Sequence, residues 1–268
     1  MVDVWLDDAR VRKITFTAPH RWASTWRANR RDAQEAVARA GRQCAYIVFD
    51  DADLDAAVAG LMAAKFRNGG QTCVCPNRVF VHSAVHDAFA AKLAARVAAL
   101  KVGPASDPAS QIGPMINARA VDKIERHVQD AIAKGAQVLT GGRRLAALGP
   151  NYYAPTVLTH ADATMACACE ETFGPVAPLT CFTTRPRWSP PPTTRRWPGR
   201  VFYSQDVRRI WRVAELLGSG IVGINEGALA SEAAPFGGVK ESGYGREGSV
   251  HGLDDYLHTK YLCQGQLD

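Results

Sequence analysis

The sequence predicts an α/β fold in which helices cover a mainly parallel β-sheet. Stretches with apolar residues at every third or fourth position alternate with short apolar runs, the pattern of successive strand and helix units. Of the 268 residues, 47% are hydrophobic and 22% are charged. The chain can therefore bury a core, in one large or two small domains. We find no internal repeat.

Four elements are expected before Gly103. They are, in order, a strand, a helix, a strand and a helix, at 46–49, 54–66, 79–81 and 85–100. The acidic residues from Asp51 to Asp53 can cap the first helix. Ser83 can cap the second helix, which should end near Gly103.

Two more helices and two more strands are expected in the second half. One helix runs from Asn117 to Gly135, where a glycine suits the end of a helix, and a strand begins at 138–139. The other helix runs from Asp206 to Leu217 and leads into a strand at 221–224. The alternation favours a parallel sheet.

The basic charge is concentrated in two segments of unusual composition. The net charge is +6. Residues 18–46 hold six arginines against two acids, a net charge of +4, and residues 184–200 hold five arginines and no acid, so the rest of the chain carries −3. Both segments are also rich in tryptophan and proline or alanine. Because the charge is confined to them, it does not indicate nucleic-acid binding.

The cysteines and the apolar runs indicate a compartment. Seven cysteines at irregular spacing, with no charged-then-apolar leader, predict free thiols and a cytoplasmic location. No apolar run approaches the roughly 20 residues of a membrane helix, so no membrane partner is expected.

A glycine-rich loop carries the first candidate for catalysis. Residues 68–75 hold Gly69 and Gly70 just before Cys73, which lets the backbone approach a ligand closely around a thiol. A thiolate there can attack a carbonyl carbon, although a lone cysteine is more often a buried packing residue. Two cysteine pairs, Cys73 with Cys75 and Cys167 with Cys169, lack the C-x₂-C spacing usual for zinc ligands, so no metal is expected.

Three motifs indicate a family. Residues 66–73 read FRNGGQTC, residues 170–175 read EETFGP, and residues 235–247 read PFGGVKESGYGRE. In this order and spacing they resemble the aldehyde dehydrogenase superfamily. The resemblance is close over 47–183 and 201–268 and fragmentary over 4–17.

The resemblance implies the fold and domains of that family. It implies an α/β aldehyde dehydrogenase-like catalytic domain at 47–246 with a mainly parallel sheet. Residues 1–46 would be a remnant of the Rossmann-type NAD(P)-binding domain, and residues 247–268 an oligomerisation segment. A folded chain would then form a homo-oligomer.

The resemblance also implies roles for individual residues. Cys73 matches the nucleophile that carries the aldehyde as a thiohemiacetal and then a thioester, with its backbone N–H holding the oxyanion. Glu171 and Phe173 match the residues that hold the nicotinamide ribose and ring of NAD or NADP, although an ordinary turn would suit them too. Phe236 matches an aromatic of the substrate funnel or is a packing residue.

Within the family, two residues are similar to the succinate-semialdehyde dehydrogenase branch. Arg67 would pair with the distal carboxylate of a small aldehyde substrate, unless it is an ordinary surface arginine. Cys75 resembles a redox-switch cysteine that could form a disulfide with Cys73. Ser231 supplies a substrate-binding hydroxyl one position beyond the expected place, which is held by Ala230.

The chain departs from the family pattern in the two basic segments. Arg39–Arg42 stands where the family has the glutamate that acts as general base, and Ala18–His20 replaces a turn facing the cofactor. Three prolines at 190–192 would remove a helix expected before Tyr203. We interpret 18–46 and 184–200 as compensated frameshifts, and the residues that grip the adenosine half of the cofactor are missing upstream.

These departures predict that this chain alone has impaired activity. The first hypothesis is NAD(P)-dependent oxidation of an aldehyde, succinate semialdehyde above all, to its acid. The alternative is a non-catalytic remnant that associates with intact subunits through the tail 256–263, which resembles the strand through which such enzymes pair.

Overall fold

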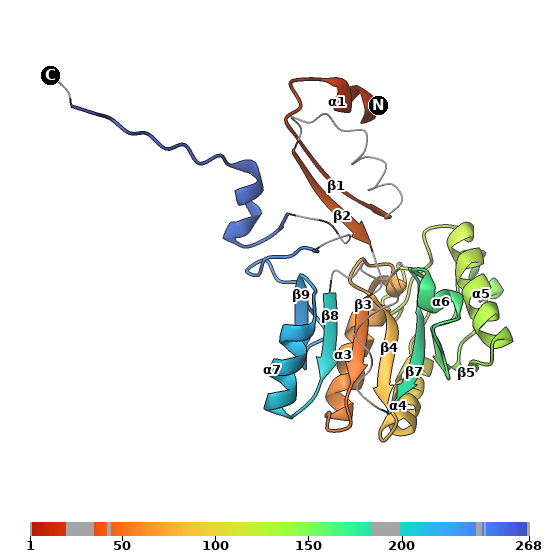
Figure 1. The fold of residues 1–268 in the computed structure, drawn as a ribbon. Helices are drawn as coiled ribbons and strands as arrows, with labels where there is room; N and C mark the ends of the chain where they lie inside the picture. The colour runs from red at the N-terminus through yellow and green to blue at the C-terminus, as the bar shows by residue number, and fades with distance from the viewer. Residues whose placement is uncertain are drawn as a thin grey trace.

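A seven-stranded sheet organises most of the chain (Figure 1). The computed structural model describes residues 2–19, 35–41, 44–183, 199–239, 243 and 245–266. The strand order is β5-β6-β7-β4-β3-β8-β9, and all neighbours are parallel except β5 and β6. This confirms the predicted mainly parallel sheet. The strands are β3 (Cys44–Val48), β4 (Pro76–His82), β5 (Gln137–Thr140), β6 (Thr156–Thr159), β7 (Val176–Phe182), β8 (Gly199–Tyr203) and β9 (Ile221–Ile224).

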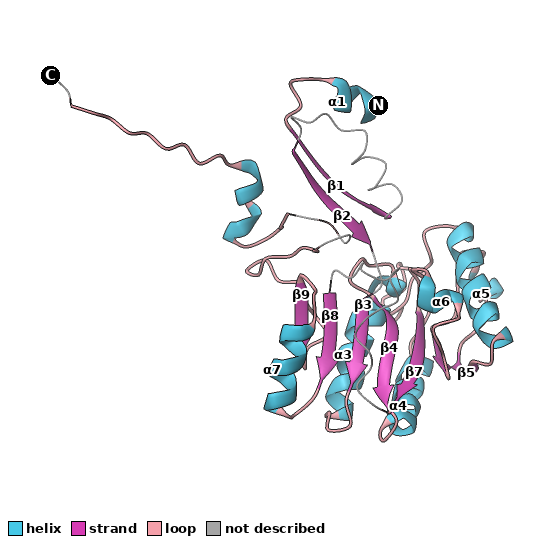
Figure 2. Cartoon of the chain, viewed as in Figure 1, coloured by secondary structure: helices cyan, strands magenta, loops and turns pink. Residues whose placement is uncertain are grey.

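Helices connect and cover these strands (Figure 2). The α-helices are α1 (Val2–Asp7), α3 (Leu54–Phe66), α4 (His86–Ala98), α5 (Ala118–Ala133), α6 (Ala166–Cys169) and α7 (Val207–Leu216). Short 3₁₀ turns are η1 (Arg67–Gly70), η2 (Ala146–Leu148), η5 (Val250–Gly252) and η6 (Asp254–Tyr256).

Alternate residues of the central strands pack against helices on opposite faces of the sheet. Tyr46 and Val48 of β3 join a buried cluster with Leu61 of α3 and Leu93 of α4. Ile47, between them, packs in a separate cluster with side chains of α7. Because successive strand side chains point to opposite faces, α3 and α4 cover one face and α7 the other.

An acidic residue ties the end of β3 to the start of α7. Asp51 accepts hydrogen bonds from the Ser204 hydroxyl at 2.8 Å and from two backbone N–H groups of the turn after β8. Arg209 donates to Asp50 at 2.7 Å and to Asp51 at 2.6 Å, and its guanidinium lies over the Phe49 ring. These contacts fix the spacing between the two central strands and the helix that covers them.

Three predicted helix starts are confirmed at atomic detail. Asp53 caps α3 by accepting from two backbone N–H groups, and Asp206 caps α7 in the same way. Asn117 caps α5 by accepting from the N–H of Ala120 at 3.0 Å. At the end of α5, Gly135 takes a φ of +98°, a conformation that favours glycine.

The boundaries of α4 and β3 differ from those predicted. Ser83 does not cap α4, because the helix begins at His86 after Val85 and has no side-chain cap. The helix ends at Ala98, and the N–H of Gly103 donates instead to the carbonyl of Ile112 in a separate bridge. β3 starts at Cys44, before the predicted Tyr46.

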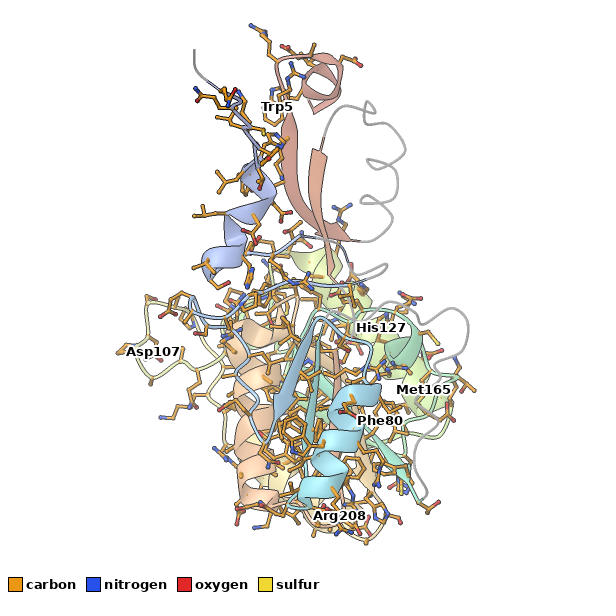
Figure 3. The ribbon with its side chains drawn as sticks, turned by 60° about the vertical axis from the view of Figure 1, so that its left-hand side comes forward. Trp5, Phe80, Asp107, His127, Met165 and Arg208 are labelled. Carbon is orange, nitrogen blue, oxygen red and sulfur yellow. The ribbon has the colours of Figure 1, made fainter. Side chains whose placement is uncertain are left out.

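A second, two-stranded sheet lies above the main one in Figures 1 and 3. β1 (Lys13–Pro19) pairs in parallel with β2 (Glu35–Gly41), and Arg39 lies opposite Thr17. The ammonium of Lys13 lies 4.9 Å from the ring centre of Tyr256, which brings β1 against η6. The described residues of the segment 18–46, which are 18–19, 35–41 and 44–46, lie in the strands β1, β2 and β3.

Some predictions fall outside the described residues. These are His20, Arg42 and the proline run at 190–192 with the helix expected there. The last two residues of the segment 184–200 are described, and they form the start of β8, paired with β3 and β9.

The tail has no regular secondary structure after Tyr256 and extends away from the body (Figure 1). Leu257, Tyr261 and Leu262 expose 66%, 84% and 77% of their surface. The segment 256–263 therefore forms no strand with the described part of this chain, because a strand requires a hydrogen-bonded neighbour.

None of the helices within the described ranges combines the length and apolarity needed to cross a membrane.

The core predicts a stability effect that can be measured. Leu93 is fully buried between α4 and the sheet, so Leu93→Ala should lower the free energy of unfolding in urea by about 2–5 kcal/mol. Leu216→Ala in α7 is the control, because Leu216 is 52% exposed. Equal effects of the two substitutions would contradict this packing.

Candidate functional site

The turn that carries Cys73 is made by three left-handed residues. Asn68, Gly69 and Gly70 have φ values of 51°, 62° and 74°, which end the helical course of α3. Residues other than glycine and asparagine adopt such values at a cost of about 1–2 kcal/mol. The sequence Asn-Gly-Gly thus produces the turn locally, and Cys73 follows it on the way to β4.

Gly70 brings the first two sequence motifs into contact. A Cβ atom at this position would lie 2.2 Å from the carbonyl oxygen of Gly174. The loop that carries Cys73 and the loop of residues 170–175 therefore touch through their backbones. Only glycine permits this distance, which explains the second of the two glycines before the thiol.

Gln71 fixes the thiol loop from its other side. Its side-chain oxygen accepts from the N–H of Ile116 at 2.9 Å, and Asn68 donates across the turn to the Gln71 carbonyl at 3.1 Å. Cys73 itself is half-buried. A partly accessible thiol on a rigid loop is the arrangement expected of a nucleophile.

Cys75 lies in a different environment from Cys73. It is fully buried, and its thiol donates to the Lys65 carbonyl at 3.5 Å. Burial raises the pKa of Cys75, against the opposing effect of the Lys65 ammonium. Because thiol oxidation requires an accessible thiolate, this environment disfavours the redox switch, which stays a prediction.

Lys65 is a buried lysine that the sequence analysis did not single out. It has no exposed surface, and its ammonium donates to the Asn77 side chain at 3.2 Å. Lysine is almost never fully buried unless it is paired, so its position behind the thiol loop is unusual. Its place on the buried face of α3, beside Leu61 and Phe66, is the signal that could have identified it.

The loop of residues 170–175 follows the short helix α6 rather than a strand. Glu171 is half-buried, and Phe173 exposes 38% of its surface with a φ of 51°. The structure thus places a carboxylate and an exposed phenyl ring on the loop that Gly174 joins to the thiol loop.

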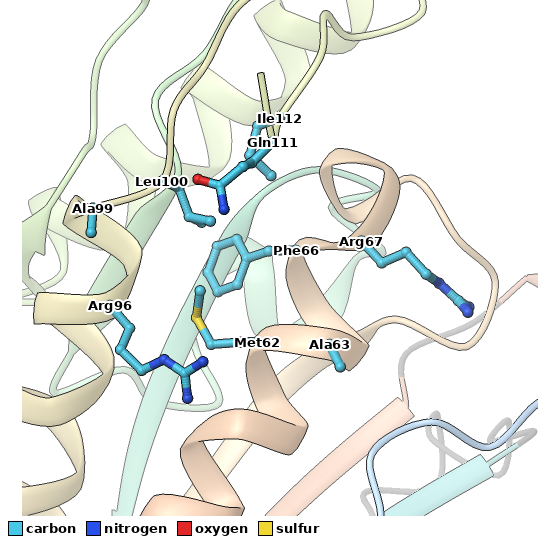
Figure 4. Close-up of a pocket in the computed structure, with 9 residues that line it drawn as sticks. All are labelled: Met62, Ala63, Phe66, Arg67, Arg96, Ala99, Leu100, Gln111 and Ile112. Atoms are coloured by element: carbon cyan, nitrogen blue, oxygen red, sulfur yellow. The ribbon is translucent and has the colours of Figure 1, made fainter. Parts of the chain in front are cut away.

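Arg67 borders a cavity of about 510 Å³ between α3 and α4 (Figure 4). Phe66 and Met62 form part of an apolar wall, and Arg96 approaches from α4. The Arg67 side chain extends from the end of α3, away from the other lining residues. The remaining lining residues are Ala63, Ala99, Leu100, Gln111 and Ile112.

The structure describes Phe236 within the third motif and Ser231 four residues before that motif begins. The exposed Ser231 hydroxyl accepts from the N–H of Ala233 at 3.3 Å, within its own turn. Phe236 is half-buried and exchanges two backbone hydrogen bonds with Glu247, at 2.7 and 2.8 Å. This pairing joins the two ends of the motif. Residues 240–242 and 244 of the motif lie outside the described residues.

Within the ranges that the structure describes, no three His, Cys, Asp or Glu side chains gather as metal ligands.

The contact between the two loops predicts the effect of a single methyl group. Gly70→Ala should destabilise the chain by at least about 1 kcal/mol, because it adds a left-handed L-residue and a clash with the Gly174 backbone. It should also change the rate at which iodoacetamide alkylates Cys73. Gly113→Ala is the control, since a Cβ there meets nothing within 4 Å. The same urea midpoint and alkylation rate for both variants would exclude the contact.

Comparisons with known proteins agree on one family. A model of the aldehyde dehydrogenase family matches residues 1–262. The chain is 49% identical over 263 residues to a probable succinate-semialdehyde dehydrogenase, NADP(+)-dependent by its name, of Sinorhizobium fredii, covering 96% of this chain and 53% of that protein. It is 49% identical over 229 residues to a 3-sulfolactaldehyde dehydrogenase of Pseudomonas putida, covering 85% of this chain and 47% of that protein.

Solved structures of this family are also similar to the chain. The crystal structure of succinate-semialdehyde dehydrogenase from Burkholderia pseudomallei superposes with a TM-score of 0.93 at 48% identity, covering 98% of this chain and 55% of that one. The chain spans about half the length of the curated relatives it matches.

Proposed function

The chain belongs to the aldehyde dehydrogenase family, and on this premise we propose that its site oxidises an aldehyde to a carboxylic acid through Cys73. The contact of Gly70 with Gly174 supports this best. It sets the loop that carries Cys73 against the loop that carries Glu171 and Phe173, which supports a common role for the three residues.

Cys73 acts first in the proposed reaction. Its thiolate attacks the aldehyde carbon and forms a C–S bond, which gives a thiohemiacetal. The backbone N–H of Cys73 donates to the oxygen that gains charge, an interaction worth roughly 3 kcal/mol in such sites. Loss of hydride from this carbon gives a thioester, and attack of water breaks the C–S bond, releasing the acid and returning the thiol.

NAD or NADP would accept the hydride when it is bound. The residues present fit its nicotinamide and ribose half, because the carboxylate of Glu171 can accept hydrogen bonds from ribose hydroxyls. The exposed ring of Phe173 offers a flat apolar surface beside it. In the proposal, these two side chains would hold the nicotinamide and ribose half when the cofactor is bound.

Arg67 supports an aldehyde that carries a second, anionic end. Succinate semialdehyde and 3-sulfolactaldehyde, named in two relatives, both end in an anion. A guanidinium pairs with carboxylate in a two-pronged geometry. Arg67 stands at the end of α3, six residues before Cys73. In the proposal its guanidinium holds the distal anion while the aldehyde carbon lies at Cys73. We propose succinate semialdehyde as the substrate, with Ser231 and Phe236 as further substrate contacts.

Arg39 favours a second candidate, a non-catalytic remnant that associates with intact subunits. This arginine lies in β2 opposite Thr17, at the place where the family resemblance puts the base. A cation cannot take a proton from water. Loss of a positioned general base lowers the rate by roughly 10²–10⁴-fold. A chain without that base would not turn over the aldehyde, and in this second candidate its exposed tail pairs with a complete subunit.

The decisive assay follows NADPH or NADH formation at 340 nm with succinate semialdehyde and the purified chain. A dehydrogenase gives absorbance that Cys73→Ser abolishes, whereas Cys181→Ser, at an exposed cysteine, leaves it unchanged. A single burst without turnover indicates the missing base, and Arg39→Glu should then restore turnover. An alkylatable Cys73 with no absorbance change in any variant supports the remnant.

The substrate proposal predicts a selective defect. Arg67→Met should raise the KM for succinate semialdehyde by about 10–100-fold, because it removes a charge-assisted hydrogen bond worth about 1.5–3 kcal/mol. The KM for butanal, which lacks the carboxylate, should change less than about threefold. Arg96→Met is the control within the same cavity. Equal changes for the two aldehydes would contradict a role for Arg67 in binding the carboxylate.

A further inference from the structure

A buried histidine on α5 bridges the two residues that flank Glu171. His127, labelled in Figure 3, has no exposed surface. Its Nε2 lies 3.2 Å from a carboxylate oxygen of Glu170, and its Nδ1 lies 3.1 Å from the hydroxyl of Thr172. One imidazole therefore contacts both neighbours of the residue proposed to hold the nicotinamide ribose.

The proton positions follow from the partners. Nε2 has two polar neighbours at 3.2 Å, a carboxylate oxygen of Glu170 and Nη2 of Arg126. Because Arg126 Nη2 already donates to Glu170 at 2.7 Å and a carboxylate can only accept, we assign the hydrogen to Nε2, which donates to Glu170. In the neutral ring Nδ1 is then an acceptor, and the Thr172 hydroxyl donates to it. Arg126 donates to the same Glu170 oxygen at 2.7 Å, which holds the carboxylate in place from the solvent side.

The surroundings keep this ring neutral. Burial lowers the pKa of His127, and the charges of Arg126 and Lys123 lower it further, while Glu170 opposes them. Each nitrogen of the neutral ring then has a different role. One nitrogen donates to Glu170 and the other accepts from Thr172, so the ring has one preferred orientation.

The loop of residues 170–175 has a backbone conformation that must be stabilised by its surroundings. Phe173 has a φ of 51°, a left-handed value that L-residues adopt only when the surroundings impose it. Next to it, a Cβ on Gly174 would lie 2.5 Å from a methyl of Ile124, so the backbone also rests directly on α5. The loop is thus held between α5 and Gly70, with the imidazole bonds just before the strained residue.

We infer that His127 is a positioning residue, which holds Glu171 and Phe173 in the conformation that receives the nicotinamide ribose. The inference rests on the proposed function for its meaning, since Glu171 and Phe173 are assigned there. Its physical content is independent of that function: without the imidazole, the loop between Glu170 and Gly174 loses its conformation.

Nitrogen NMR tests the proton assignment on the full chain. Proton-detected ¹⁵N spectra at pH 7 should give His127 the shifts of a neutral ring protonated on Nε2. A ring protonated on Nδ1, or a charged ring, would overturn the inference, because either state contradicts the assigned hydrogen bonds.

A fluorine probe tests the positioning, with no cofactor and no activity required. With 4-fluorophenylalanine at position 173, His127→Leu should shift or broaden the ¹⁹F resonance, because both imidazole bonds are lost. His127→Gln should restore much of the original signal, since its amide can still donate to Glu170. Val128→Ala is the control, a buried change on the same helix that lowers stability and leaves these bonds intact. Identical spectra for His127→Leu and the unaltered chain would overturn the inference.

Thr172 gives a second, milder test. Thr172→Val keeps the shape and removes the hydroxyl, whereas Thr172→Ser keeps the hydroxyl. We expect the valine variant to shift the ¹⁹F signal and the serine variant to retain it, and the reverse order would refute the role of the hydroxyl.

In active protein, His127→Leu should raise the KM for NADP⁺ about tenfold and leave the KM for succinate semialdehyde within about twofold. This difference is expected when one hydrogen bond between Glu171 and the cofactor is lost. Absence of dehydrogenase activity would remove the proposed function alone, since the ¹⁹F comparison still decides the role of His127.

Discussion

The candidate site depends on one backbone contact, the approach of Gly70 to the carbonyl of Gly174. A side chain at position 70 would occupy the space of a peptide group, so the contact exists only because glycine stands there. Through it, the loop after α3 and the loop after α6 form one unit, although about a hundred residues separate them along the chain. The thiol, the carboxylate and the exposed phenyl ring owe their common location to this unit.

Buried polar side chains pack against the two loops of this unit. Lys65 donates to Asn77 beneath the thiol loop, and His127 bridges Glu170 and Thr172 beneath the other loop. A buried polar group is stabilising only when its hydrogen bonds are made, so each of these side chains is restricted to one orientation. Cys75, with its thiol against the Lys65 carbonyl, shares this buried environment, whereas Cys73 two positions earlier is half-buried.

The two arginine-rich segments have different consequences for the protein. Residues 199 and 200 of the second segment continue the main sheet as the first residues of β8. In the first segment, β2 pairs with β1 in a separate two-stranded sheet, and Arg39 belongs to it. Of the described residues of these segments, the main sheet takes residues 44–46 at the start of β3 and residues 199 and 200 at the start of β8. The position that the family resemblance assigns to the general base, in contrast, falls within the first segment, in β2.

The sequence by itself determined the elements whose signals are local. The capping residues Asp53, Asn117 and Asp206 predicted helix starts correctly, because a side chain bonds to backbone only two or three residues away. The motif around Cys73 and its two partner motifs indicated the family, which the comparisons confirm. Only the tertiary structure decided what depends on distant segments. It showed that α4 starts without a side-chain cap, that Gly70 meets Gly174, and that His127 bridges the neighbours of Glu171. These contacts join residues far apart in the chain, and no local periodicity or spacing carries that information.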